Sequence, residues 1–252
     1  MKEKLIGLTK KKSFHIVIII LIITILLCIL VGTILRYDIV GEKNMPFTID
    51  KITIISTSEG TDKENNDAKW DFLIDQNNDI YIYIEKNENY PKTEIIDSVV
   101  LDNFSYEKNS EYGVVGVYKP ENSNENIIFK TSEDNKTDQI EFIGDVNSDI
   151  KNLKMSNQGD MIGFRISNSN IKEYISNDEE VINHTELLKK INITSEELKL
   201  KVNFDITINL KSEKSFNTNV SIELPVGDVI NEGTTSFEIT DTSNYIFKRI
   251  RN

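Results

Sequence analysis

Residues 198–224 read LKLKVNFDITINLKSEKSFNTNVSIEL and contain the clearest pattern in the chain. From Leu198 to Leu210 every second residue is apolar and each residue between is polar, as in a β-strand with one buried and one solvent-facing side. So long a strand is expected to contain a bend or bulge. The polar segment 211–215 has hairpin length, and alternation resumes until Pro225 and Gly227. The stretch therefore predicts an antiparallel hairpin.

A second hairpin is predicted over residues 70–84. Apolar residues alternate on both sides of the segment 76–79, whose Asn and Asp side chains suit a chain reversal. A helical stripe covers 178–191, with Asn177 and Asp178 as candidate caps. Further strands are expected at 47–56, 95–104, 112–118, 126–130, 139–144, 160–167, 235–240 and 245–250.

Short strands separated by polar loops, with one short helix, predict an all-β fold, an antiparallel β-sandwich. No Pro-, Gly- or Ser-rich linker divides residues 47–252, and the nearest change in composition lies at 144–158. Since all-β domains of this size occur as single units, we favour one large sandwich over two smaller packed ones.

The N-terminal segment has a different character. Residues 16–35 are twenty consecutive uncharged and mostly aliphatic positions, and as a helix they would match the roughly 30 Å hydrocarbon core of a bilayer. We therefore predict a transmembrane helix over residues 14–35 that contacts the lipid bilayer, followed by a juxtamembrane linker, residues 36–46. Cys28 within the span is interpreted as a small apolar filler rather than a lipidation site.

The charges flanking the span predict its orientation. Residues 1–15 carry five Lys and one Glu, whereas residues 36–50 carry two basic and three acidic groups. An excess of basic residues marks the cytoplasmic side, so residues 1–13 are expected to form a cytoplasmic stub and residues 47–252 an extracellular domain. A cleaved secretory signal is the alternative, but its apolar core is usually shorter, and Val31-Gly32-Thr33 is a poor cleavage site.

Charge and composition exclude several classes of function. The chain has 29 basic and 41 acidic groups, a net charge of −12, which argues against a nucleic-acid partner. One Cys excludes an internal disulfide framework or a cysteine-based zinc site, and two His leave little for a His-rich metal centre. Past residue 43, 22 basic and 38 acidic groups give a net charge of −16.

The sequence singles out no catalytic, cofactor-binding or metal-ligating residue. His184 is the one imidazole beyond the span, and with no Ser or Asp assignable to it we interpret it as a surface residue. The segment Asp145–Asp149 begins like a calcium loop, but Ile150 and Ser156 stand where that loop needs Gly and Glu. An ordinary Asx-rich turn is therefore favoured.

Two tyrosines give the one positive indication of binding. Tyr81 and Tyr83 alternate with isoleucines and so share the opposite face of their strand. Exposed tyrosines can stack on sugar rings or anchor a protein interface. The alternative, which we favour, is a central strand covered on both faces.

Two late segments, residues 220–228 (VSIELPVGD) and residues 231–236 (NEGTTS), follow a single N-terminal anchor and an acidic β-rich region. With these features the chain resembles uncharacterised single-pass membrane proteins of low-GC Gram-positive, clostridia-like bacteria. The resemblance implies no activity and no site residues.

These observations favour a non-catalytic, membrane-anchored extracellular β-sandwich that binds or scaffolds an envelope protein or a neutral glycan. The acidic surface disfavours bare anionic polymers. The alternative is a carboxylate-dependent hydrolase of envelope glycans, which would hold two acids about 5–10 Å apart across a cleft. We expect no cofactor.

Overall fold

The structure, a computed structural model, describes residues 2–42, 44–63, 69–121, 128–177 and 180–251. It divides into two units, residues 1–43 and 44–252. The first is helix α1 (Lys2–Val40), of which His15–Tyr37 is long and apolar enough to cross a membrane. The helix runs beyond Leu35 into the predicted linker because nothing breaks it before Gly41, which has a φ of 71° and donates its N–H to the Tyr37 carbonyl at 2.8 Å.

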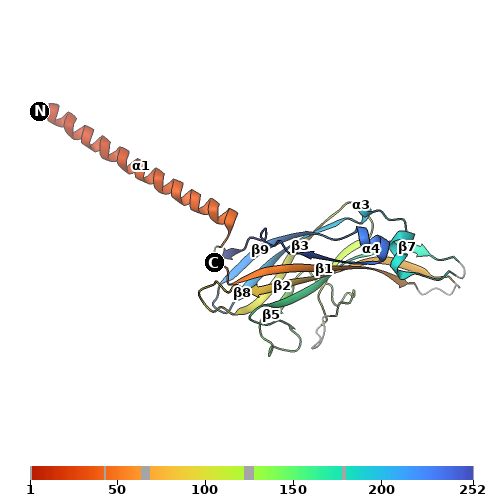
Figure 1. Cartoon of the computed structure of the whole chain (residues 1–252). Coiled ribbons are helices and arrows are strands. Elements are labelled where there is room, and N and C mark those ends of the chain that lie inside the picture. Colours follow the sequence, from red (N-terminus) through yellow and green to blue (C-terminus); the bar gives the residue numbers. More distant parts are fainter. Residues whose placement is uncertain (1, 43, 64–68, 122–127, 178–179, 252) are drawn as a thin grey trace. The chain divides into compact units, whose positions relative to one another are not determined.

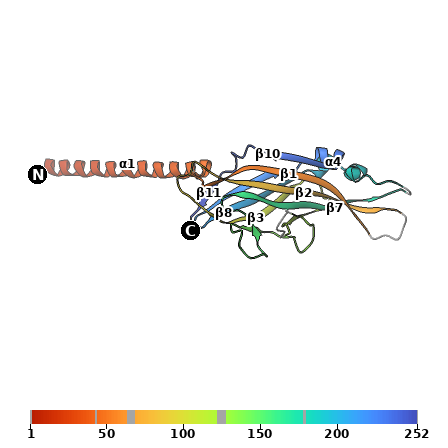
Figure 2. The same cartoon turned by 60° about the horizontal axis from the view of Figure 1, so that its bottom comes forward.

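The second unit consists of two β-sheets, which appear as two layers in Figures 1 and 2. Sheet A has the order β10-β1-β2-β7-β4 and sheet B the order β11-β9-β8-β3-β5-β6. All described pairings are antiparallel except β5 with β6. Sheet A comprises β1 (Phe47–Asp62), β2 (Asp71–Lys86), β4 (Val114–Tyr118), β7 (Asp160–Ile175) and β10 (Thr234–Ile239). Sheet B comprises β3 (Ile96–Lys108), β5 (Ile140–Ile143), β6 (Leu153–Lys154), β8 (Leu200–Leu210), β9 (Ser215–Glu223) and β11 (Lys248–Ile250).

The prediction of an all-β fold behind an apolar helix is confirmed. Apolar side chains from both sheets form one large core. It includes the rings of Phe164 and Phe204, with the partly buried Phe104 packed against them, and the three centroids lie 5.2–5.6 Å apart. Residues 44–252 form one compact unit.

The hairpin that opened the sequence analysis is confirmed as β8 and β9, paired from Lys201 opposite Glu223 to Asn209 opposite Ser215. Strand β8 starts at Leu200 rather than Leu198, because Ser195–Leu198 form helix α3 under a capping box from Thr194 and Glu197. The bend or bulge expected within β8 is not found, because its pairing with β9 is continuous. The register shifts lie instead in the neighbour β3, between Ile96 and Ser98 and between Asp102 and Ser105, where Asn103 has a φ of 54°.

The predicted turn at residues 76–79 is wrong, because β2 runs through it without a break. Gln76 and Asn78 are fully buried and bonded to neighbouring strands. Ser56 of β1 donates to the Asn78 side chain, the Asn78 amide donates to the Ile166 carbonyl at 3.2 Å, and the Gln76 amide donates to the Pro225 carbonyl at 3.1 Å. These partners stabilise amide side chains inside a strand, where local preference alone favours a turn.

Other boundaries also differ from the predictions. Strands β1 and β7 extend to Asp62 and Ile175, and the predicted strand 245–250 is reduced to β11. Of the predicted strand 126–130, residues 126 and 127 lie outside the described residues, and Ile128 forms only an isolated bridge with Glu121.

The helix predicted over residues 178–191 is shorter in the structure than its apolar stripe suggests. Its described part is the 3₁₀ turn η1 (His184–Glu186) and α2 (Leu187–Lys190), capped by the Asn183 side chain rather than by Asn177; Asp178 lies outside the described residues. Asn192, with a φ of 50°, follows its end. Helix α4 (Gly227–Glu232) was not predicted. Leu187, Leu188, Ile191, Leu198 and Val229 from these helical segments form a second core with Phe72, Ile74, Ile171 and Ile193.

Candidate binding surfaces

Tyr81 and Tyr83 lie on the outer face of β2, a central strand of sheet A, and both are half-buried. The Tyr81 ring meets Phe129 edge-to-face with centroids 5.9 Å apart, and burial raises the pKa of Tyr81. Lys51 Nζ lies 4.9 Å from the centre of the Tyr83 ring. Both rings are thus engaged within the molecule, which favours the interpretation of a covered strand.

An ion pair beside these tyrosines joins β2 to β7. Arg165 donates from Nε and Nη2 to the two carboxylate oxygens of Asp79, at 2.6 and 3.0 Å, and its guanidinium lies 5.6 Å from the Phe129 ring centre. Burial lowers the pKa of Arg165, but the hydrogen bonds and charge of Asp79 outweigh it and raise that pKa. The pair holds two strands in register, which is a structural role.

One pair of carboxylates lies on facing strands of sheet B. Asp102 and Asp205 lie directly opposite each other on β3 and β8, and burial, followed by the charge of Asp205, raises the pKa of Asp102. Asp205 accepts hydrogen bonds from the amides of Asn103 and Asn219, at 2.9 and 2.8 Å. This pair lies on the outer face of sheet B and lines neither of the two cavities described below.

The other residues weighed from the sequence have local roles. His184 is exposed, with its ring edge-on to Phe72 at 5.9 Å. Asp145 Oδ1 accepts the Asn147 N–H and Asp149 Oδ1 accepts the Lys151 N–H, both at 2.9 Å. This segment therefore has the Asx turns that were favoured.

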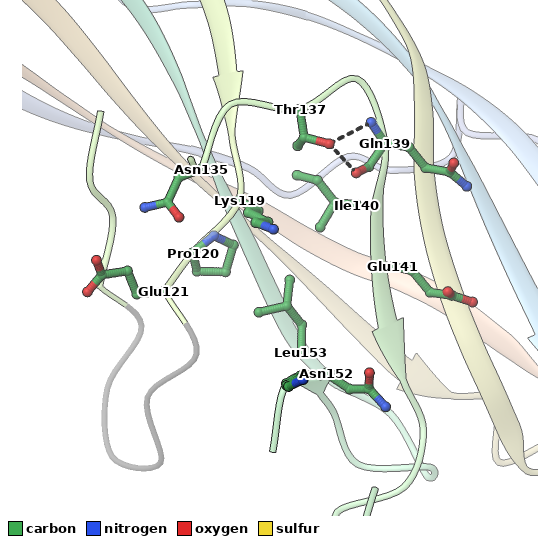
Figure 3. Close-up of a pocket in the computed structure, with 11 residues that line it drawn as sticks. Lys119, Pro120, Glu121, Asn135, Thr137, Gln139, Ile140, Glu141, Asn152 and Leu153 are labelled. Atoms are coloured by element: carbon green, nitrogen blue, oxygen red, sulfur yellow. Dashed lines mark hydrogen bonds between the residues drawn. The ribbon is translucent and has the colours of Figure 1, made fainter. Parts of the chain in front are cut away.

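One cavity, of about 560 Å³, lies between the loop after β4 and strands β5 and β6. In Figure 3 Ile140 and Leu153 lie at its centre, and the charged ends of Glu121 and Glu141 point outward on opposite sides. Thr137 Oγ1 closes its upper wall by bonding the N–H and carbonyl of Gln139, at 3.2 and 2.6 Å. The lining is mainly polar side chains and lies mostly on loops.

A second cavity, of about 530 Å³, lies between β9 and β10 at one side of the sandwich, and we call it the lateral groove. Its lining includes Leu224, Pro225, Phe237, Ile239 and Tyr245. Phe237 is 49% exposed, and burial raises the pKa of Tyr245. Five of its eleven lining residues lie on β9 and β10, and the others lie on the adjoining loops. A largely apolar concave surface is a usual form of binding site.

Neither a scan against protein-family models nor a search of curated proteins finds a match for this chain.

The lateral groove was not found from the sequence. The alternation over residues 235–240 predicts the strand that carries Phe237 and Ile239. The same alternation assigns both side chains to the buried core. Their exposure depends on which strand of the opposite sheet reaches them, and only the sheet order shows this. The end of the alternating pattern at Pro225, which lines the groove, is the one feature of the sequence that marks this place.

Proposed function

We propose that this protein is a single-pass membrane protein that displays a non-catalytic, ligand-binding β-sandwich outside the cell. The cytoplasmic N-terminus follows from the Lys-rich flank of the apolar helix. The observation that carries the binding role is the lateral groove, a largely apolar concavity between β9 and β10 with a half-exposed phenylalanine. Its ligand is an envelope protein or a neutral glycan, since an acidic domain repels anionic polymers.

The carboxylates support a binding role over hydrolysis. The pKa of Glu94, Glu107, Glu180 and Glu238 is lowered by hydrogen bonds and ion pairs, although burial opposes this most strongly at Glu94. A general acid in a glycosidase needs a raised pKa inside a substrate cleft. Burial raises the pKa of Asp71, Asp75 and Asp102, but none of the three lines either of the cavities described above.

The test uses the full-length chain in lipid nanodiscs, mixed with purified cell envelopes. We expect saturable co-sedimentation and no release of reducing sugar ends. Pronase treatment of the envelopes separates the two ligand classes, because it abolishes binding to a protein and spares binding to a glycan. Release of reducing ends that the variant Asp102→Asn abolishes would contradict the proposal and establish the hydrolase. Absence of envelope binding would also contradict it.

A further inference from the structure

Strand β9 has a free edge along its second half. Strand β11 pairs only with Ser215, Phe216 and Asn217. The bonds from Leu224 N to Leu200 O and from Leu210 N to Lys214 O, both 2.9 Å, place the even-numbered residues of β9 in the hydrogen-bonded pairs with β8. The N–H and C=O groups of residues 219, 221 and 223 therefore point away from β8. None of the backbone bonds found in the described part of the chain engages them.

The opposite sheet presents apolar side chains at the same place. Phe237 and Ile239 of β10 pair with Ile54 and Ile52, which are fully buried in the main core, so all four side chains face the space between the sheets. Phe237 nevertheless stays 49% exposed, and it lines the lateral groove together with residues 221–223 of β9. In the described part of the chain, no strand of sheet B pairs with β9 on this side beyond Asn217.

The charged residues of the lateral groove are acidic. Glu223 and Asp241 line it, and none of its eleven lining residues is basic. Lys199 lies 3.4 Å from Glu223, but Asp241 is held only by Ser243 among its described partners. An acidic rim favours a cationic occupant, whereas a second copy would bring together two domains of net charge −16.

We propose that the lateral groove binds an extended, basic segment of a protein partner, which adds to sheet B as a strand antiparallel to β9. This inference rests on the proposed binding function and specifies the partner. Six added residues span about 20 Å and would pair with residues 219, 221 and 223. Main-chain bonds supply affinity in this mode of recognition, and alternate side chains supply specificity.

The geometry of antiparallel pairing determines which residues of the partner face outward and which face the groove. Residues directly opposite each other have side chains on the same face of a sheet. The side chains of Asn219, Ser221 and Glu223 lie on the outer face, so the partner residues bonded to them also face outward, where Lys or Arg meets Glu223. The residues between face inward and cover Phe237 and Ile239.

The probe is a fluorescent peptide, KVKVKVK, titrated into the full chain in nanodiscs by anisotropy. We expect it to bind, with an affinity that falls as salt is raised, and the peptide EVEVEVE to bind at least tenfold more weakly. N-methylation of the Lys amides should abolish binding because those amides face β9. N-methylation of the Val amides should leave binding within about twofold.

Matched variants test the two halves of the groove. Ser221→Pro removes an N–H from the free edge of β9 and should weaken binding at least tenfold. Ser236→Pro is the control. The bond from Ser58 N to Gly233 O places the odd-numbered residues of β10 in the hydrogen-bonded pairs with β1, so loss of the Ser236 N–H breaks no bond between these strands. Phe237→Ser should weaken binding about tenfold, and Val114→Ser, on the 62%-exposed Val114 of β4, should not. The double variant Glu223→Lys/Asp241→Lys should prefer EVEVEVE, which shows that the variant protein is folded.

Several results would overturn the inference: no binding of KVKVKVK, equal binding of both peptides, or binding unchanged by Ser221→Pro. A dimer of the full chain that Ser221→Pro dissociates would assign the edge to a second copy and also overturn it. If Ser221→Pro leaves envelope binding intact, the proposed function stands and this inference alone fails.

Discussion

Single side chains decide the path of strand β2. Asn78 is fully buried, accepts a hydrogen bond from Ser56 and donates one to the Ile166 carbonyl. Along β2 it lies between the isoleucines of the large core and Phe72 and Ile74 of the second core. Because these bonds satisfy the Asn78 amide inside the sheet, residues that usually favour a turn lie here in the middle of a long strand.

Replacement of this amide should destabilise the fold. Asn78→Ala leaves the Ser56 hydroxyl and the Ile166 carbonyl without their partner, at a cost of about 1–3 kcal/mol in the free energy of unfolding. Urea denaturation measures the difference, and Asn89→Ala, at an exposed position, is the matched control. Equal stability of the two variants would contradict this role for Asn78.

A glycine gives a second prediction at this scale. Gly159 has a φ of 105°, and a Cβ there would lie 2.6 Å from the Ile84 carbonyl oxygen. Gly159→Ala should therefore lower the free energy of unfolding by about 1–3 kcal/mol or more. Gly227, at the first residue of α4, has open space around a Cβ, so Gly227→Ala should stay within about 1 kcal/mol of wild type. Thermal unfolding of both variants provides the comparison, and a tolerated Gly159→Ala would refute the argument.

At the scale of elements, an ionic cluster ties the segment after β7 to helix α2. Glu180 accepts hydrogen bonds from Lys190, from the Tyr174 hydroxyl at 2.7 Å and from the Asn177 N–H at 3.1 Å. These contacts, Lys190 first, lower the pKa of Glu180 to about 2 from its ordinary value of 4.5. Because the folded state favours the carboxylate, Glu180 contributes stability above pH 4.5 and loses it as pH falls toward 2.

A pH series on Glu180→Gln tests this element. Wild type should be more stable than the variant above pH 5, and the difference should shrink as pH falls from 4.5 to 2. Glu141→Gln, which removes an exposed carboxylate, is the matched control. A wild-type advantage that stays constant down to pH 2 would contradict the lowered pKa.

Elements differ in how far the sequence predicts them. The β8–β9 hairpin was predicted because its alternation is uninterrupted and its loop is short, so local pattern and tertiary role agree. Strand β2 was misread because Gln76 and Asn78 find their partners on β1, β7 and Pro225, all distant in sequence. The lateral groove was missed because it arises from β11 being three residues long beside the nine residues of β9, which no local pattern reports.

The whole chain combines an apolar helix with an acidic β-sandwich. Because His15–Tyr37 is long and apolar enough to cross a membrane, we expect the chain to fractionate with membranes and to resist extraction by carbonate. Replacement of Leu26 and Ile29 by Arg should place charge at the bilayer centre at a cost of about 2.5–3.5 kcal/mol per residue. We expect this variant to lose membrane insertion, whereas Leu26→Val/Ile29→Val should insert normally. Normal insertion of the Arg variant would show that the helix is not a span.

Cysteine labelling in intact cells tests whether the helix is a permanent anchor with the sandwich outside the cell. The chain has one cysteine, so Cys28→Ser gives a cysteine-free background. Into it we place Glu133→Cys, at a side chain 88% exposed on the sandwich, or Gly7→Cys in the predicted stub. A membrane-impermeant maleimide should label Glu133→Cys in intact cells and Gly7→Cys only after permeabilisation, on the same full-length chain. Labelling of Gly7→Cys from outside, or its loss from the mature chain, would contradict the account.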